Sequence, residues 1–484
     1  MRKLTMISLA FVLALSSLVG CSSKESGALD PKNPVTIEVW TYYNGAQKTA
    51  FDTMVDEFNE TVGKEKGIFV ESSSSGGVNE LIESIQFELD KPEGERELPD
   101  IFGCYSDTAR DVDKEGLLVN LDNYMTEEEL SEYVDAYIEE GRIGEDNSLK
   151  IFPVAKSTEV LMINKTDWEK FSKAAGASLD SFKTWESLIQ LSKEYYEWTD
   201  SQTPEPDDGK AMFGRDSFAN YINVGCAQLG EELFQVDKDV LTLNVNKEAM
   251  RRLWDNYYVP YISGYFASNG RFRSDDMKTG DLIALTGSSS SATYFPTEVT
   301  VEDNEPYPIE SLVLEMPNFE GTEPYVVQQG AGMAVSKSNS AKEYASVEFL
   351  KWFTDTERNT KFSIESSYLP VKKAANDVSY IGKVVEENHL TWDQIVRDTV
   401  EVSISQCQNY TLYSSKPFKN GNDARNIIND SMVNKAMADR EKVVELLNGG
   451  SGLDSAVAQI NTDENFDQWF ESMKTDLENT CAAE

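Results

Sequence analysis

Few side chains in this sequence are equipped for catalysis. The chain has a single histidine, His389, for which an exposed position on a helix is the simplest expectation. One imidazole alone disfavours a Ser-His-Asp triad and a histidine-rich zinc site. Paired carboxylates for glycoside hydrolysis stay possible among the 84 acidic residues, because such pairs are recognised by their separation in space. The sequence therefore gives little support for histidine-based catalysis, and we expect no metal and no cofactor.

The cysteines carry no recognisable metal or redox motif. Cys104, Cys226, Cys407 and Cys481 are spread along the chain without a CxxC pair, so a zinc ribbon or a redox site is unsupported. They can form up to two disulfides or remain buried thiols, and their spacing does not decide between these alternatives.

Two short segments resemble parts of known ligand loops. Gly330-Ala-Gly332 begins like a dinucleotide-binding fingerprint, but Val335 stands where the third glycine belongs. Asp237-Lys-Asp239 resembles a fragment of a calcium loop, without the glycine and the distant glutamate that such a loop needs. We expect a strand in the first case and a hairpin in the second.

The charge of the chain excludes one class of partner. There are 44 Lys and Arg against 84 Asp and Glu, a net charge of −40. Nucleic-acid binding needs clustered basic side chains, so it is not expected here. A strongly anionic ligand is disfavoured as well, unless a local basic pocket holds it.

The first residues read as an export signal with a lipid anchor. Residues 1–20 combine Arg2 and Lys3 with an apolar stretch that is too short to span a bilayer. Leu18-Val-Gly-Cys21 resembles the lipobox of bacterial lipoproteins, which predicts a diacylglyceryl group on Cys21. Residues 21–34 then form a polar tether. This pattern predicts a protein anchored at the extracellular face of the bacterial cytoplasmic membrane by its lipid alone.

The body of the chain alternates between strand and helix patterns. Strand patterns at 35–40, 67–70 and 99–103 are separated by amphipathic helix patterns, the first of which carries Phe51, Met54, Val55 and Phe58 on one face. This βαβαβ order predicts a parallel sheet with helices on both faces, and such sheets bind ligands at the carboxyl ends of their strands. Longer helices are expected at 185–196, 247–258, 342–354 and 425–448.

Several motifs, in order, resemble extracellular solute-binding protein family 1, which includes the maltose-binding and glycerol-3-phosphate-binding proteins of ABC importers. The resemblance extends over about 35–473. The motifs that carry it are Leu98-Pro-Asp-Ile101, Gly116-Leu-Leu-Val-Asn-Leu-Asp122, Ile151 to Lys165, Thr184-Trp-Glu186, Gly280 to Phe295, Gly330 to Ser336 and Tyr368-Leu-Pro370.

The resemblance implies a two-lobed Venus-flytrap fold, with an α/β sandwich in each lobe and a hinge between them. Lobe 1 is expected at 35–153 plus 308–355, and lobe 2 at 154–307 plus 356–484. Hinge closure around the ligand is the expected working motion.

The resemblance also implies where the ligand is held. Aromatic rings that stack on a pyranose and polar groups that bind hydroxyls are expected on the loops after the strands. The positions that match are Tyr42, Tyr43, Ser75, Asp107, Ser157, Asp216, Phe218, Ser288, Ser289, Tyr294, Gly330 and Arg425.

The family further implies a function in uptake. A monomer is expected to capture a sugar or oligosaccharide and deliver it to the permease subunits of an ABC importer. A glycerol-3-phosphate or glycerophosphodiester ligand is an alternative within the fold, although Lys419, Asn422 and Arg425 do not cleanly match the family's phosphate-binding arginine. A surface glycan-degrading lipoprotein is the alternative from another class.

Overall fold

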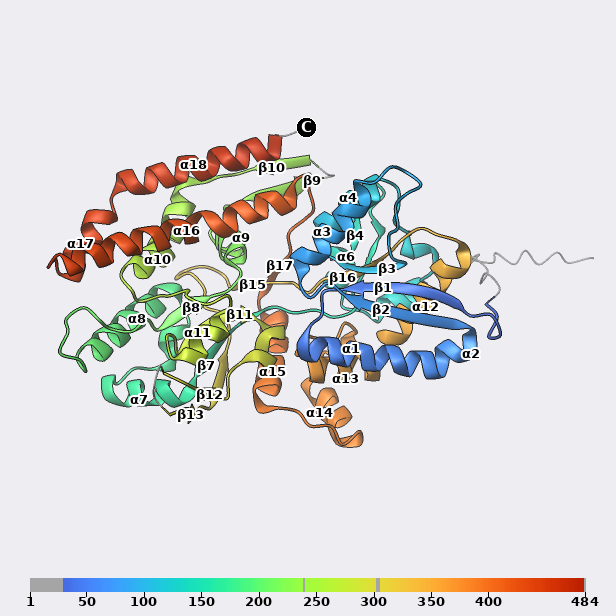
Figure 1. Ribbon diagram of the computed structural model, residues 1–484, viewed down its shortest axis with the longest axis horizontal. Helices are drawn as coiled ribbons and strands as arrows, with labels where there is room; N and C mark the ends of the chain where they lie inside the picture. Colours follow the sequence, from blue (N-terminus) through green and yellow to red (C-terminus); the bar gives the residue numbers. More distant parts are fainter. Residues whose placement is uncertain (1–28, 238–239, 302–304, 483–484) are drawn as a thin grey trace, which may run out of the picture.

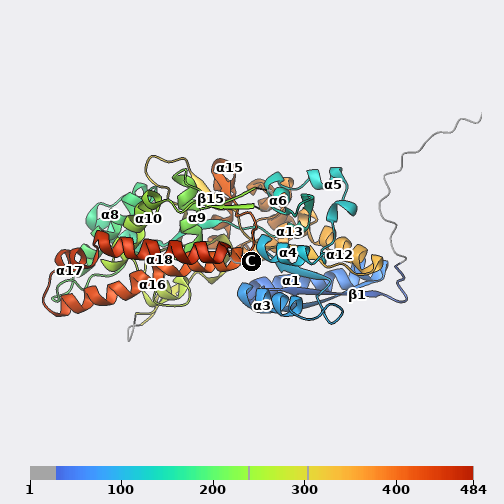
Figure 2. The same ribbon diagram turned by 90° about the horizontal axis from the view of Figure 1, so that it is seen from above.

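The computed structural model describes residues 29–237, 240–301 and 305–482 as two α/β bodies placed end to end (Figure 1). Figure 2 shows the same division from above. The predicted signal segment 1–20 and Cys21 lie outside the described residues. Within the part of the chain that is described, no helix combines the length and apolar character needed to cross a membrane.

The first lobe is built on a five-stranded sheet in the order β2-β1-β3-β16-β6. Strands β1 (Val35–Thr41), β2 (Ile68–Ser74) and β3 (Ile101–Cys104) run parallel, as the βαβαβ pattern predicts. Strand β16 (Gly332–Val335) pairs antiparallel with both β3 and β6 (Ile151–Phe152), so the sheet is mixed.

Two helices pack where the periodicity places them. Helix α1 (Gly45–Phe58) buries Phe51, Met54, Val55 and Phe58 against the sheet, and α3 (Val78–Leu89) follows β2. Helices α4 (Ser106–Lys114), α12 (Ser340–Phe353) and α13 (Thr356–Ser366) complete this lobe.

The second lobe contains a four-stranded sheet in the order β14-β7-β11-β8. Its strands are β7 (Glu159–Asn164), β8 (Phe213–Arg215), β11 (Ala284–Ser288) and β14 (Ser311–Leu314). The largest hydrophobic core of the protein lies on one side of this sheet. The helices that line this core include α7 (Lys165–Ala175), α8 (Trp185–Asp200), α9 (Phe218–Gln228), α10 (Lys247–Ile262), α16 (Gly421–Asn448), α17 (Leu453–Ile460) and α18 (Asp463–Ala482).

Smaller elements complete this lobe. The 3-10 turn η4 (Ser289–Tyr294) and α11 (Arg273–Thr279) cover the other face of the sheet, together with α15 (Gln394–Asn409). Strands β9 (Phe234–Asp237) and β10 (Val240–Leu243) form the predicted hairpin, with residues 238–239 outside the described part. Strand β15 (Tyr325–Val327) pairs with β17 (Thr411–Tyr413).

Two segments lie in the other lobe from the one predicted. The segment that contains strands β14 and β15 was expected in lobe 1, but β14 pairs with β7 in the second sheet and Val326 of β15 belongs to the second core. Helix α13 was expected in lobe 2, but Phe362 belongs to the core of the first lobe, as does Tyr368 in the segment that follows. The lobe boundaries came from the family resemblance, and no local pattern in the sequence indicates which sheet a segment packs against, which explains both errors.

The predicted tether is also shorter than expected. Leu29 packs against the core of the first lobe, and Asp30 closes a turn with Asn33. The backbone at Asp30 lies so close to Gly67 that a Cβ there would come within 2.5 Å of it. Residues 29–34 therefore form part of the lobe.

Candidate functional site

Three crossing segments connect the two lobes and lie side by side. Lys156 donates its backbone N–H to Leu369, and Ser157 pairs with Gln329 through reciprocal backbone hydrogen bonds. Gly330 has a φ of +91°, and a Cβ there would lie 2.7 Å from the carbonyl oxygen of Ala155. Only glycine allows this close approach. The predicted site residues Ser157 and Gly330 are thus parts of the hinge.

A cluster of tyrosines lies beside these crossing segments. Tyr42 follows β1, Tyr105 follows β3, and Tyr368 belongs to a crossing segment. The Tyr42 and Tyr368 hydroxyls are 3.2 Å apart, and Tyr42 also accepts the backbone N–H of Ala331. Burial raises the pKa of each of these phenols, so their hydroxyls remain protonated donors. The carboxyl ends of parallel strands position two of them, as expected for this sheet.

The serine-rich loop of the second lobe contacts the first lobe. Gln47 of α1 donates its side-chain amide to the carbonyl of Ser290 at 3.1 Å, and Tyr294 donates its hydroxyl to Asn44 Oδ1 at 2.8 Å. Tyr368 also hydrogen-bonds to Ser290. The lobes therefore touch across the site, and we call this arrangement the closed form.

Asp107 makes a second contact between the lobes. Its Oδ1 accepts the backbone N–H of Phe418, just before α16, at 3.1 Å. Burial raises the pKa of Asp107 to about 6, and the nearby Asp111 adds to this rise. The Phe418 N–H and the guanidinium groups of Arg425 and Arg110 lower the pKa and partly oppose it. The carboxylate expected to bind ligand hydroxyls is occupied by the opposite lobe in this closed form.

Arg425 projects from the first turn of α16 toward the same region. It donates through Nη2 to Asn220 Oδ1 at 2.8 Å and to Ser217 Oγ at 3.2 Å. Asn220 in turn donates to Glu159 Oε1 and to Gln329 Oε1. Among the described residues, no carboxylate lies within 4.0 Å of the Arg425 guanidinium. Its side chain is thus fixed by neutral groups.

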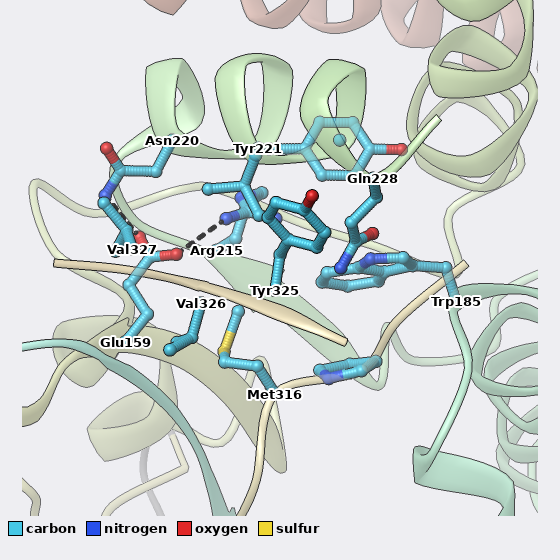
Figure 3. Close-up of a pocket in the computed structure, with 13 residues that line it drawn as sticks. Glu159, Trp185, Arg215, Asn220, Tyr221, Gln228, Met316, Tyr325, Val326 and Val327 are labelled. Carbon is cyan, nitrogen blue, oxygen red and sulfur yellow. Dashed lines mark hydrogen bonds and ion pairs between the residues drawn. The ribbon is translucent and has the colours of Figure 1, made fainter. Parts of the chain in front are cut away.

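A small cavity lies behind this network in the second lobe (Figure 3). Arg215 points into it between the rings of Trp185 and Tyr221, at 5.4 and 4.8 Å, and pairs with Glu159 at 3.4 Å. The cavity volume is ≈ 20 Å³, which is room for about one water molecule. Burial raises the pKa of Glu159, and Arg215 opposes that rise most strongly. Arg215 and Glu159 thus form a buried ion pair, and Glu159 accepts the hydrogen bond that holds the Asn220 side chain in place.

The structure brings half of the predicted site residues to the interface between the lobes or to the hinge. They are Asp107, Ser157, Ser289, Tyr294, Gly330 and Arg425. Tyr42 lies beside the hinge, where it contacts Tyr368 and Ala331, and Ser288 hydrogen-bonds to Ser290 within the serine-rich loop. Ser289 is fully buried and fixes the end of β11 to the hinge, where it accepts the Thr158 N–H.

The remaining predicted residues lie elsewhere. Tyr43 packs against Phe51 and Phe362 in the first core, and Phe218 packs against Tyr257 in the second. The stacking role expected for Phe218 does not fit its position, because α9 turns this ring inward. Asp216 accepts the backbone N–H of Arg273, and Ser75 donates its own N–H to Thr41.

Sequence reasoning missed several polar groups of the interface. Gln47, Asn220 and Gln329 all carry side-chain amides there. Tyr368 lies in the Tyr-Leu-Pro motif, which could have indicated it. The amides gave no local signal, because they are brought together by contacts between distant parts of the chain. His389 is exposed just beyond α14 (Val378–Glu387), close to its expected position.

The cysteines outside the predicted lipid anchor are unpaired. Cys104, Cys226, Cys407 and Cys481 are free thiols, so the disulfides left open by the sequence are not formed. In the described ranges, no group of three or more His, Cys, Asp or Glu side chains is placed to hold a metal ion.

Solved structures share this architecture over almost their whole length. A cyclic α-maltosyl-1,6-maltose binding protein from Arthrobacter globiformis is 18% identical with a TM-score of 0.62, over 93% of this chain and 99% of that one. UgpB from Mycobacterium tuberculosis, solved with glycerophosphocholine, is 16% identical with a TM-score of 0.68, over 92% and 99%. An ABC substrate-binding protein from Listeria monocytogenes, solved with cycloalternan, is 18% identical with a TM-score of 0.63, over 91% and 100%. These likenesses confirm the two-lobed fold.

Comparison of the sequence with curated proteins finds no match. Residues 53–390 match the family described as bacterial extracellular solute-binding protein. This match extends over more than half of the chain, from α1 to the segment after α14, and contains most of the interface between the lobes. The chain belongs to the family of bacterial extracellular solute-binding proteins.

Proposed function

We propose that this protein captures a sugar or oligosaccharide between its lobes and delivers it to the permease of an ABC importer. The observation that carries the proposal is the chemistry of the interface. Tyr42, Tyr105 and Tyr368 offer rings and protonated hydroxyls beside the hinge, while Gln47 and Asn220 offer amides. Aromatic faces and planar polar groups together are what a pyranose needs from its site.

The solved relatives support this ligand class. Two of them bind, by their descriptions, a cyclic α-maltosyl-1,6-maltose and cycloalternan. Both ligands are neutral and rich in hydroxyl groups. A neutral ligand also suits a chain with a net charge of −40.

The motion we propose is opening and closing about the crossing segments. Strands β1, β2, β3 and β16 with α1, α3, α4, α12 and α13 move as lobe 1, and the sheet containing β7 with α7 to α10 and α16 to α18 moves as lobe 2. In the closed form Asn44 and Gln47 of lobe 1 already touch Tyr294 and Ser290 of lobe 2. Opening breaks these hydrogen bonds and exposes the tyrosines to solvent, and closure around a ligand re-forms them.

The anchoring proposal rests on the sequence. A lipid on Cys21 would hold a monomeric body at the extracellular face of the cytoplasmic membrane, near its permease. The test is growth with a radiolabelled fatty acid. We expect label on the natural protein and none on the Cys21→Ala variant, which should be released to the medium. Label on both would contradict a lipid at this cysteine.

Binding is tested by calorimetric titration of the soluble chain from Ser22 onward against mono- and oligosaccharides. We expect a saturable one-site isotherm with one sugar class and no product after prolonged incubation. Tyr105→Phe should weaken binding about tenfold, since a lost hydrogen bond to a ligand costs about 1 kcal/mol or more. The matched control is Tyr257→Phe, in the second core, which should bind as the unaltered protein does. The absence of binding to every sugar, or the release of a shorter product, contradicts the proposal.

A glycerophosphodiester is the second candidate, because no carboxylate of the described residues lies within 4.0 Å of the Arg425 guanidinium. UgpB, with the same fold, was solved with glycerophosphocholine. The Arg425→Gln variant distinguishes the candidates. It should lower the affinity for a phosphodiester about a hundredfold, since a charge-assisted hydrogen bond contributes about twice as much binding free energy as a neutral one. It should weaken a neutral sugar by about tenfold or less.

A further inference from the structure

A second pocket lies on lobe 2, away from the interface between the lobes. Its volume is ≈ 250 Å³, and Arg440 of α16 forms part of its wall. Helix α16 begins at the interface with Gly421 and runs toward the far end of the lobe (Figure 1). At 1.5 Å per residue, Arg440 is about 28 Å along the helix from Gly421. A ligand in this pocket therefore does not contact the tyrosine cluster.

Arg440 is unusual among the arginines of this acidic chain. In the described residues most arginines have a carboxylate within 4.0 Å, including Arg215, Arg252 and Arg273, whereas Arg440 has none. Its Nη1 donates to the carbonyl of Ile262 at 2.9 Å, and its guanidinium hydrogen-bonds to the Tyr196 side chain. Burial lowers the pKa of Arg440, as expected for a half-buried cation without an anionic partner.

The rest of the wall suits a small polar ligand. Lys210 is exposed beside the pocket and, among the described residues, also has no carboxylate within 4.0 Å. Gly264 has a φ of +82°, and a Cβ there would lie 2.9 Å from Arg440 Cζ, so glycine keeps this place open for the guanidinium. Asn269 and Asp281 add an amide and a carboxylate that can bind hydroxyl groups.

We infer that this pocket binds a small polyhydroxylated ligand that carries one oxyanion, a carboxylate or a phosphate. The planar guanidinium of Arg440 matches an oxyanion with parallel hydrogen bonds, and Lys210 adds a second positive charge. Binding would supply the anionic partner that the half-buried Arg440 lacks among the described residues. Asp281 lines the same pocket, and its carboxylate, which accepts the Thr279 hydroxyl at 2.7 Å, favours hydroxyl groups at the other end of the ligand over a second anion. This inference does not depend on which solute the lobes capture.

The experiment titrates the soluble chain with inorganic phosphate and with glucuronate, separately, in calorimetry at constant ionic strength. Both probes carry an oxyanion, and only glucuronate adds hydroxyl groups. We expect saturable one-site binding, tighter for glucuronate, and a loss of about tenfold in the Lys210→Gln variant. Lys173→Gln removes the same charge from the exposed surface of α7 in the same lobe and should leave the affinity unchanged.

Three results would overturn the inference. They are the absence of saturable binding of both probes, equal weakening by Lys210→Gln and Lys173→Gln, and loss of binding in the interface variant Tyr105→Phe. The last result would place the probe between the lobes, so the two sites are told apart. Arg440→Lys keeps the charge but loses the planar fork, and it should reduce binding at least as much as Lys210→Gln does. If that variant does not fold, Lys210→Gln still decides the question, because its side chain is exposed.

Discussion

Asp107 of lobe 1 and Gly421 of lobe 2 touch across the interface, so that a Cβ added at Gly421 would lie 2.6 Å from Asp107 Cγ. The Asp107 carboxylate also accepts the Phe418 N–H just before α16. The Phe418 N–H and the partial positive charge at the N-terminus of that long helix favour the ionised carboxylate, but burial outweighs them and raises the pKa of Asp107. Closure thus brings an acid of one lobe onto a helix end of the other, and glycine is required at the point of contact.

The first prediction concerns Gly421→Ala. The added methyl group forces the Asp107 carboxylate to rotate away from Phe418 or forces the lobes apart, and both weaken the closed form. Alanine is the better helix former, so the melting temperature should not fall. We expect ligand affinity to drop about tenfold, or about 1.4 kcal/mol. In small-angle X-ray scattering, the ligand-free variant should be more extended than the natural protein.

A matched control is available in α14. Gly382 lies inside this helix, and an added Cβ would meet no atom within 4 Å. Gly382→Ala should raise stability slightly and leave affinity and scattering unchanged. Equal affinity of the Gly421→Ala variant and the natural protein would contradict the contact between Asp107 and Gly421.

The second prediction concerns pH. Burial in the closed form raises the pKa of Asp107 to about 6 from an ordinary value of 3.8, and opening returns the carboxyl to solvent. A raised pKa means that the closed form binds the proton more tightly. The protonation of Asp107 therefore stabilises the closed form fully below pH 3.8, and this stabilisation is lost as the pH rises through about 6.

Titration of the carbohydrate at a series of pH values checks this prediction. Affinity should be about tenfold higher at pH 5 than at pH 7. Asp107→Asn keeps the acceptor for Phe418 without the charge, so its affinity should vary much less over this range. A natural protein with the same affinity at both pH values would exclude Asp107 as the coupled group.

The sequence predicted well what depends on local pattern. Phe51 and Phe58 recur with the period of a helix and are buried as expected, and the first three strands run parallel. Strand β14 was not predicted as a separate element, and its partner β7 is far away in the chain. Periodicity reports which face is apolar and does not report which surface covers it.

The site was best predicted where a strand end and the family resemblance coincide. Tyr42 and Asp107 follow β1 and β3, and both lie at the interface. Gln47 is an ordinary polar residue of α1 until Ser290, far along the chain, comes within hydrogen-bond distance. Phe218 has the right residue type and a position just after a strand, but the direction of α9 turns it into the core.

The third prediction concerns thiol reactivity. Burial raises the pKa of Cys104 and of Cys226 to about 12, so almost no thiolate forms at neutral pH. Native protein treated with iodoacetamide should therefore be modified at the half-buried Cys481 first, and at Cys104 and Cys226 only after unfolding. Mass spectrometry of the digested protein locates the label. Rapid labelling of Cys104 in native protein would contradict its position in the first core.

The fourth prediction concerns the ion pair of Arg215 and Glu159, whose side chains are 1% and 4% exposed. Arg215→Leu leaves a buried carboxylate without its cation, which typically costs about 3 kcal/mol or more. The midpoint of urea unfolding should fall accordingly. Arg397→Leu, which removes an exposed arginine paired with Glu401 on α15, should leave the midpoint unchanged.

A double variant tests whether this cost comes from the unpaired charge. Glu159→Gln combined with Arg215→Leu removes both charges. In the natural protein Asn220 donates to Glu159 Oε1 at 2.9 Å, and the side-chain amide oxygen of the new glutamine can still accept this hydrogen bond. We expect the double variant to be more stable than Arg215→Leu alone, because the carboxylate no longer lacks a partner. Since Asn220 also holds Arg425, the double variant should retain ligand affinity. The contrary result is a loss of unfolding free energy in the double variant that equals the sum of the losses in the two single variants. It would show that the two side chains stabilise the lobe independently, through packing against Trp185 and Tyr221, and not as an ion pair.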